Sequence, residues 1–279
     1  MLHWKWIGVA MYPGQSIENL DHYGCWTGTA QLDTDGTPTI LYTGVRSKLE
    51  KETQLIATAS DSNITSWVKS SQNPVLERPP REYFFPNQIS GFRDPTFWFD
   101  NEYKFWRLFI GSGLKNLGGM VLQYESSSLY GPWNFTKPLL FGNATNHGDM
   151  WECPDFFPLS SVDGTVSKWV LLFGDDSKQK NYYFIGEFDK RKQIFIPSPQ
   201  FAHPTILDAG NFYACKTALD KNGNRFLYGW SPEDRSVSEY SAAGWAGIQT
   251  IPRRLVLAND AATLLFYPLP LDSLGYAVD

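Results

Sequence analysis

The sequence predicts an all-β fold built from repeated antiparallel units, as in a β-propeller. Aromatic residues make up 16% of the chain, and aromatic and β-branched residues favour strands. Segments that alternate apolar and polar residues recur in groups, and the groups begin in a similar way. The four openings are "CWTGTAQL" (25–32), "RDPTFWF" (93–99), "ECPDFFPL" (152–159) and "NFYACKTAL" (211–219).

The repeat spacing and the turns identify each group as one sheet. Openings near positions 25, 93, 152 and 211 are 68, 59 and 59 residues apart. Stretches such as "DTDG" and "DKNGN" separate the strands and supply hairpin turns. No amphipathic helix longer than about one turn is predicted. Units of three or four strands at this period are typical of propeller blades. A two-sheet sandwich is the alternative, but its strands would not restart with the same pattern.

The composition excludes several classes of function. The net charge is −5 without a block of like charges, so a nucleic-acid partner is not expected. No apolar run reaches the roughly 18 residues of a membrane span. The N-terminus lacks the pattern of a signal peptide. The 3 Cys and 4 His residues are scattered, which predicts neither a disulfide framework nor a metal site.

Polar residues in the first strand of each group predict a shared pocket. In a propeller these first strands line the central channel, so their side chains converge at one end of it. Carboxylates, an arginine and aromatic faces together are the usual makeup of a sugar site. The alternative for each residue is a charge at a strand end that is solvated or paired. The residues are Trp26, Thr27, Arg93, Asp94, Glu152, Asp208 and Asn211.

Several segments resemble glycoside hydrolase family 32, which includes invertases, fructan hydrolases and fructosyltransferases. The likeness runs from about residue 4 to about residue 274, in the order of the family. The resemblance implies a five-bladed propeller followed by a β-sandwich. It places an incomplete propeller in residues 1–262 and the start of a linker towards an absent sandwich in residues 263–279. The segments are "GCWTGTA" (24–30), "FRDPTFW" (92–98), "MWECPDFFPL" (150–159) and "GNFYACKTAL…GWAGIQTIPRRLVL" (210–257).

The resemblance assigns roles to individual residues. Glu152 of "WEC" corresponds to the general acid/base, and Asp94 of "RDP" to the carboxylate that stabilises the transition state. Arg93 beside it is expected to hydrogen-bond the sugar. The remaining substrate-binding residues implied by the resemblance are Trp26 and Thr27 at the fructose subsite, Asp175 and Lys178 on the glucose side, and Trp230 as an aromatic wall.

Retaining glycosidases use two carboxyl groups, one as nucleophile and one as acid/base, so neither a metal nor an organic cofactor is expected. The acid must hold a proton to give to the leaving group. Trp151, Phe156 and Phe157 predict an apolar setting that would desolvate the Glu152 carboxyl. The alternative is that Glu152 only pairs with Arg93 for structure.

The nucleophile implied by the resemblance, an Asp in an "NDPNG"-like motif, is missing from the 279 residues. Residues 1–23 resemble the last part of blade one, which suggests that about 50 residues are absent at the front. Either the chain is a fragment of an enzyme, or it is a natural chain that has lost catalysis. Open strand edges in an incomplete blade favour the fragment.

The lineage therefore predicts an enzyme that hydrolyses β-fructosyl bonds in sucrose or fructans. A small carbohydrate is the only predicted partner. The first alternative is an inactive sugar-binding protein on the same propeller. The second is a protein-interaction propeller of the WD type. Glycosylation-like triplets at Asn63, Asn134 and Asn143 predict a secreted or vacuolar location.

Overall fold

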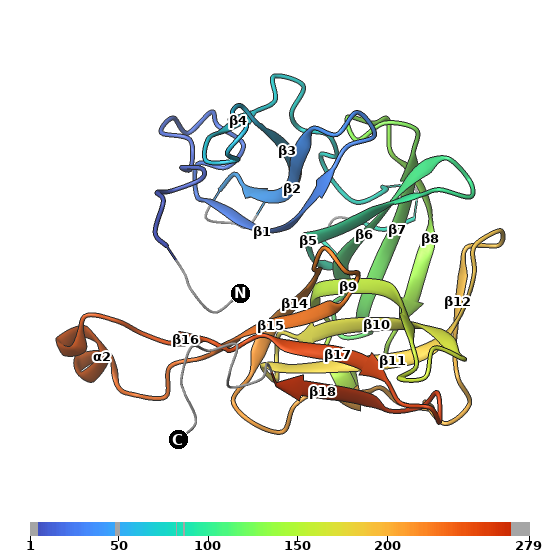
Figure 1. The fold of residues 1–279 in the computed structure, drawn as a ribbon. Coiled ribbons are helices and arrows are strands. Elements are labelled where there is room, and N and C mark those ends of the chain that lie inside the picture. Colours follow the sequence, from blue (N-terminus) through green and yellow to red (C-terminus); the bar gives the residue numbers. More distant parts are fainter. Residues whose placement is uncertain (1–4, 48–50, 82, 86, 269–279) are drawn as a thin grey trace. The chain divides into compact units, whose positions relative to one another are not determined.

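The computed structural model describes residues 5–47, 51–81, 83–85 and 87–268. It divides into two compact units. The N-terminal unit has residues 6–154 and 175–178, and the C-terminal unit has residues 155–174 and 179–268 together with Lys5. Nearly all of the regular structure is β-strand (Figure 1).

Two four-stranded antiparallel sheets make up most of the N-terminal unit. Their strands follow one another in the chain, in the orders β1-β2-β3-β4 and β5-β6-β7-β8. The first sheet has β1 (Gly24–Leu32), β2 (Pro38–Val45), β3 (Glu52–Ala59) and β4 (Trp67–Lys69). The second has β5 (Ile89–Asp100), β6 (Phe105–Leu114), β7 (Gly118–Ser126) and β8 (Asn134–Phe141), and a short helix, α1 (Ala144–His147), follows it. The predicted "DTDG" turn joins β1 to β2, and Gly36 within it has a φ of 87°, which glycine adopts without a Cβ clash.

Two further antiparallel sheets form the C-terminal unit. One has the order β12-β11-β10-β9 with β13 beside β11, and the other has β14-β15-β17-β18 with β16 beside β15. The bounds of the first are β9 (Trp151–Ser160), β10 (Ser167–Asp175), β11 (Lys180–Asp189), β12 (Ile194–Pro197) and β13 (Thr205–Ile206). Those of the second are β14 (Tyr213–Leu219), β15 (Arg225–Ser231), β16 (Ile248–Gln249), β17 (Arg253–Leu257) and β18 (Leu264–Pro268). The first residues of β9 and the last of β10 belong to the N-terminal unit.

The predicted all-β fold and its repeat are confirmed. The first strands β1, β5, β9 and β14 lie at the four predicted openings, and each sheet has the sequential strand order of a propeller blade. Four successive sheets of this kind differ from the two facing sheets of a sandwich. Residues 5–23 contain no strand, so the partial first blade and the count of five stay predictions.

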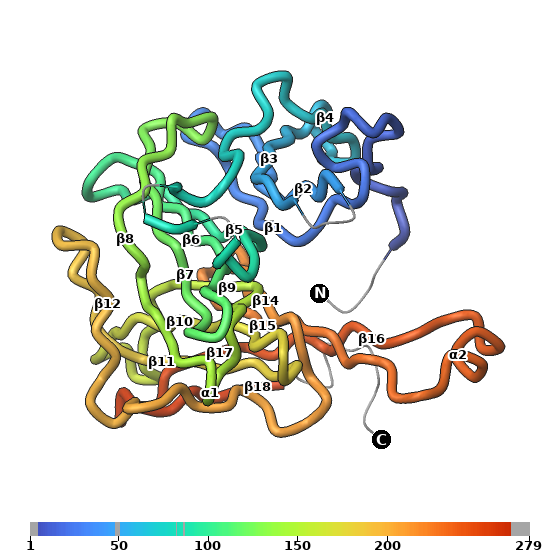
Figure 2. Tube along the Cα trace, turned by 180° about the vertical axis from the view of Figure 1, so that it is seen from behind, coloured from blue at the N-terminus to red at the C-terminus, as the bar shows by residue number. Residues whose placement is uncertain are grey.

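Two features of the C-terminal unit bear on the expectations. Residues 264–268 pair with β17 as the outer strand of the last sheet, and the predicted boundary after residue 262 and the linker stay predictions, with residues 269–279 outside the described residues. The unit also has a helix longer than the one turn expected, α2 (Val237–Ala243), in the hairpin that extends away from this sheet (Figures 1 and 2). A capping box between Ser236 and Glu239 begins α2, because the two residues satisfy each other's backbone N–H groups.

Strands β6 and β7 of the second sheet in the N-terminal unit are buried on both faces. Every residue of β6 from Trp106 to Gly113 is buried, which explains why this strand reads as an apolar run and not as an alternation. Arg107, inside that run, pairs with Asp100 at 2.8 Å and lies 4.7 Å from the centre of the Phe105 ring. Among the described residues, neither helix is long and apolar enough to cross a membrane.

Candidate active site

The predicted site residues of the first two sheets lie in β-bulges. The strand register shifts between Cys25 and Gly28 in β1, and between Arg93 and Thr96 in β5. Asp94, inside the second bulge, has a φ of 63°. Bulges re-aim side chains, and a positive φ at a non-glycine residue is a strain that is common at functional sites. The same feature recurs directly after Glu152, where the residue that follows it, Cys153, has a φ of 47°.

Hydrogen bonds join the strands that carry these bulges. The hydroxyl of Thr29 in β1 donates to the carbonyl oxygen of Pro95 in β5 at 2.9 Å. The hydroxyl of Thr96 in turn donates to the carbonyl oxygen of Pro154 in β9 at 2.5 Å. The first strands of three sheets are therefore tied together at the positions that carry the predicted site residues.

Arg93 is the centre of the cluster. Its Nε and Nη2 donate to Oε1 of Glu152 at 2.9 and 2.7 Å, and its Nη1 donates to Oε1 of Glu52 at 2.9 Å. The residue is only 7% exposed. Burial opposes the charge, but Glu52 and Glu152 outweigh it and raise the pKa of Arg93. A buried cation is stable only with such partners, and Arg93 has one on each side.

Glu52 was not predicted from the sequence. It is the first residue of β3, it is buried, and its second oxygen accepts the N–H of Phe92. Burial raises the pKa of Glu52, although Arg93 acts in the opposite direction. The signal that could have revealed it was an acidic residue opening the apolar strand "ETQLIATA", because a buried carboxylate requires a partner.

Asp94 is fixed by backbone contacts. Its Oδ2 accepts the N–H of Cys153 at 2.8 Å, and its own N–H donates to the hydroxyl of Thr43 at 2.9 Å. That hydroxyl donates to Gln54, whose amide reaches the carbonyl oxygen of Phe92 at 2.7 Å. Because Cys153 follows Glu152 in the chain, Asp94 lies beside the backbone that carries Glu152, and the catalytic roles of the two carboxyl groups stay predictions.

Trp26 supplies an aromatic face beside this cluster. The residue is 39% exposed, and the guanidinium carbon of Arg93 lies 6.0 Å from the ring centre. At this distance a cation interacts favourably with an aromatic ring. Thr27 follows in the same bulge and is exposed. Trp26 and Thr27 are therefore free to meet a ligand.

Asp175, the last residue of β10, and Lys178, in the turn that follows, are the residues predicted on the glucose side. Asp175 is fully buried, and its Oδ1 accepts the N–H groups of Ser177 and Lys178. Lys178 donates through Nζ to the carbonyl oxygen of Asn146. The exposed carboxylate of this turn is instead Asp176, which lies 3.7 Å from Arg93 and was not predicted. The role of Asp175 and Lys178 in binding stays a prediction.

The remaining predicted residues lie in the C-terminal unit. Trp230 is on β15 and 43% exposed, and its place in a sugar site stays a prediction. Asp208 pairs with Arg253 at 2.7 Å. Asn211 donates to the carbonyl oxygen of Pro232, and both Asp208 and Asn211 precede β14 instead of opening it. Within the described ranges, no group of three or more His, Cys, Asp or Glu side chains is placed to hold a metal ion.

Trp151 packs away from the carboxyl of Glu152, contrary to the expectation from their adjacency. Its indole lies against Gly119 and Gly142, and its N–H donates to the carbonyl oxygen of His147. Neighbouring residues of a strand point to opposite faces, so the sequence run "WEC" does not place the indole around the acid. The ring of Phe156 packs in another aromatic cluster, with Trp169 and Phe188.

We expect Gly119→Ala to lower the free energy of unfolding by about 1–3 kcal/mol, the usual cost of overpacking. A Cβ at this position would lie 2.1 Å from Cδ1 of the Trp151 indole, so the strand that carries Glu152 would have to shift. Urea unfolding measures the effect. Gly210→Ala is the control, because its Cβ would meet only Asp208 Oδ1, at 3.2 Å. Equal losses in both variants would contradict the packing argument.

Comparison with known proteins identifies the family. The model of the glycosyl hydrolases family 32 N-terminal domain matches residues 1–268. The chain belongs to this family. An insoluble β-fructofuranosidase isoenzyme of Arabidopsis thaliana is 34% identical over 96% of the chain and 46% of its own length. An insoluble isoenzyme of Oryza sativa subsp. indica is 38% identical over 89% of the chain and 44% of its own length.

Solved family 32 structures agree with this assignment. Fructan 1-exohydrolase IIa from Cichorium intybus is 29% identical, with a TM-score of 0.79 over 93% of the chain and 49% of the chicory chain. The chicory enzyme has also been solved in complex with 1-kestose. The chain therefore spans about half the length of the relatives it matches.

Proposed function

We propose that the cluster around Arg93 is the fructose-binding site of a β-fructofuranosidase-type glycoside hydrolase. The observation that carries the proposal is the arrangement of Arg93, Asp94 and Glu152, which are held together by hydrogen bonds beside the exposed ring of Trp26. Carboxylates and an arginine bind sugar hydroxyls, and an aromatic face covers the apolar side of a sugar ring. The relatives named above are hydrolases of fructosides, and the chicory complex contains a fructan oligosaccharide.

The residues divide the chemistry between them. Glu152 acts as the acid/base that protonates the leaving group, for which its partial exposure (18% of the side chain) gives the necessary access. Asp94 holds fructose hydroxyls and stabilises the transition state. Arg93 orients Glu152 and is itself oriented by Glu52. The substrates are sucrose or fructans, and the bond is cleaved with retention through a fructosyl-enzyme intermediate.

A second candidate is a sugar-binding protein without catalysis. The specific observation in its favour is that the 279 residues contain no "NDPNG"-like stretch to supply the nucleophile. Such a protein would bind fructosides through the same residues but would not form the covalent intermediate. Binding and turnover therefore have to be measured separately.

We place the protein on the secretory route, either outside the cell or in the vacuole. The asparagines of all three glycosylation-like triplets, Asn63, Asn134 and Asn143, are exposed, as the modification requires. A maize relative is named as a cell wall isozyme.

Trp26→Ala should weaken binding of fructose or sucrose by about tenfold, because it removes the exposed aromatic face. Isothermal titration calorimetry on the purified chain measures the effect. Trp245→Ala is the matched control, since Trp245 is 54% exposed and also lies against an arginine, at 4.0 Å from Arg235, but it belongs to the C-terminal unit. Absence of sugar binding by the unmodified chain, or equal loss in both variants, would overturn the proposed site.

A further inference from the structure

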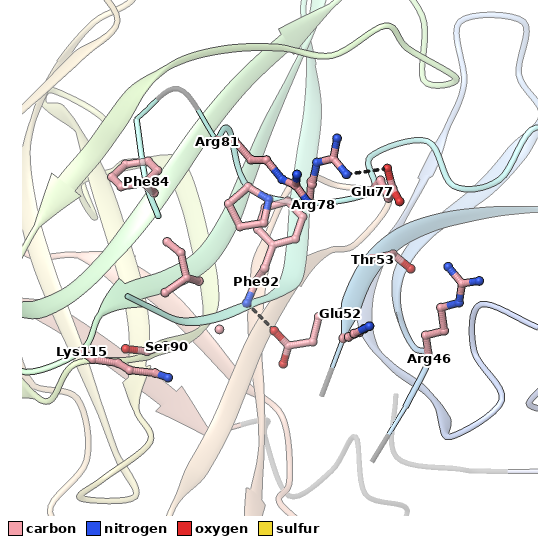
Figure 3. A pocket seen from close by; sticks show the side chains of 14 residues that line it. Arg46, Glu52, Thr53, Glu77, Arg78, Arg81, Phe84, Ser90, Phe92 and Lys115 are labelled. Atoms are coloured by element: carbon pink, nitrogen blue, oxygen red, sulfur yellow. Dashed lines mark hydrogen bonds and ion pairs between the residues drawn. The ribbon is translucent and has the colours of Figure 1, made fainter. Parts of the chain in front are cut away.

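A cavity of about 560 Å³ lies in the N-terminal unit, next to the candidate active site. It lies within the 300–1,000 Å³ range of small-molecule sites. Residues from three parts of the chain line it (Figure 3): around the start of β3, before and at the start of β5, and Lys115 after β6. Among the described residues, those that line it are Arg46, Lys51–Thr53, Glu77–Pro79, Arg81, Phe84, Ile89–Phe92 and Lys115. Glu52 is in its wall, but Arg93, Asp94 and Glu152 are not.

Positive charge dominates this cavity. Five cationic and two acidic side chains line it: Arg46, Lys51, Arg78, Arg81 and Lys115 against Glu52 and Glu77. Figure 3 shows the labelled cations around Glu52 and Phe92. The excess stands out because the whole chain has a net charge of −5.

Each of the two acidic residues in the wall already forms an ion pair with an arginine. Glu77 pairs with Arg78 at 3.3 Å, and Glu52 pairs with Arg93 at 2.9 Å. Over the described ranges, no ion pair involves the other four cations, Arg46, Lys51, Arg81 and Lys115. Over the complete segments 46–53 and 77–92 together with Lys115, the sequence has six cationic and four acidic residues, so the excess remains positive.

An independent observation points to a missing partner in the same wall. The hydroxyl oxygen of Ser90 is buried and has no hydrogen-bond partner among the described residues. A buried hydroxyl without a partner is unfavourable. Ser90 lines the cavity, so a rotation of its side chain would let this hydroxyl donate to a ligand oxygen there.

We propose that this cavity binds a phosphate group, either free or carried on a small organic molecule. A phosphate has between one and two negative charges near pH 7 and several strong acceptor oxygens. Arginine forks bind phosphate with two hydrogen bonds each, and lysines add point charges. The wall shares Glu52 with the candidate active site but contains neither Arg93, Asp94 nor Glu152, so phosphate binding and fructoside hydrolysis can be measured separately.

Isothermal titration calorimetry on the purified chain tests the site with three probes: inorganic phosphate, glucose 6-phosphate and neutral glucose. Binding of inorganic phosphate would show that the free ion alone is enough to occupy the cavity. Binding of glucose 6-phosphate alone identifies a carried phosphate, and glucose should not bind in this cavity. The affinity should fall as the NaCl concentration rises, because the contact is between charges.

Point variants locate the binding. Lys115→Gln and Arg81→Gln should each weaken it by about tenfold, and Ser90→Ala should weaken it without changing the net charge. Lys221→Gln is the matched control, because Lys221 is exposed on a turn of the C-terminal unit and makes the same charge change. No binding of either phosphate probe, or an equal effect of Lys221→Gln and Lys115→Gln, would overturn the proposal.

Discussion

Arg93→Met is expected to lower the free energy of unfolding by about 3–5 kcal/mol, the usual cost of breaking a buried ion pair from one side. The substitution keeps the volume of the side chain but leaves Glu52 buried without its cation, and Glu152 loses two hydrogen bonds. Chemical denaturation of the purified variant measures the loss.

Two controls separate this effect from a general sensitivity to charge loss. Arg78→Met removes an exposed partner of Glu77 and should cost under about 1 kcal/mol, as exposed pairs do. The double variant Arg93→Met/Glu52→Gln should regain at least about 1 kcal/mol over Arg93→Met, because the stranded carboxylate is gone. If the double variant is no more stable than the single one, Glu52 is not the group that Arg93 neutralises.

The repeat was predictable because each sheet begins with a similar strand and turns at Asp, Asn and Gly. The bulges were not, since an extra residue in a strand leaves the local composition unchanged. They matter for the site: without the shift between Arg93 and Thr96, Asp94 would point to the same face as Thr96. Helix α2 carried a readable signal in "SVSE" (236–239), a capping box pattern, but its short length hid the periodicity.

The candidate site was predictable only as far as its residues lie in the repeat openings. Arg93, Asp94 and Glu152 lie in the first strands of their sheets, so the spacing of the repeats pointed to them. In the structure, Arg93 bonds Glu152, and Asp94 bonds the backbone of the next residue. Glu52 opens the third strand of its sheet, and the period gives no reason for it to meet Arg93. Sequence adjacency also misled, because Trp151 precedes Glu152 but points to the opposite face of the strand.

Glu152→Gln is expected to reduce fructoside hydrolysis by about 10²–10⁴-fold, the usual contribution of a general acid/base. Glutamine keeps the size of the side chain and can still accept from Arg93, but it cannot transfer a proton. The rate has to be measured on the chain preceded by a blade-one segment with the "NDPNG"-like motif, taken from a relative. The unextended chain should turn over sucrose and inulin little or not at all, because it has no residue placed as a nucleophile by the resemblance.

The matched control for this experiment is Glu187→Gln in the same extended chain. Glu187 lies on β11, with its side chain 62% exposed and paired with Lys168, so its loss should leave the rate unchanged. Rescue by the extension together with loss of that rescue in Glu152→Gln would support Glu152 as the acid/base. Turnover of the unextended chain at ordinary enzyme rates, about 1–10³ per second, would mean that another residue is the nucleophile. In that case Asp176, the exposed carboxylate 3.7 Å from Arg93, is the first residue to replace, because a retaining site needs a second carboxyl group close to the acid.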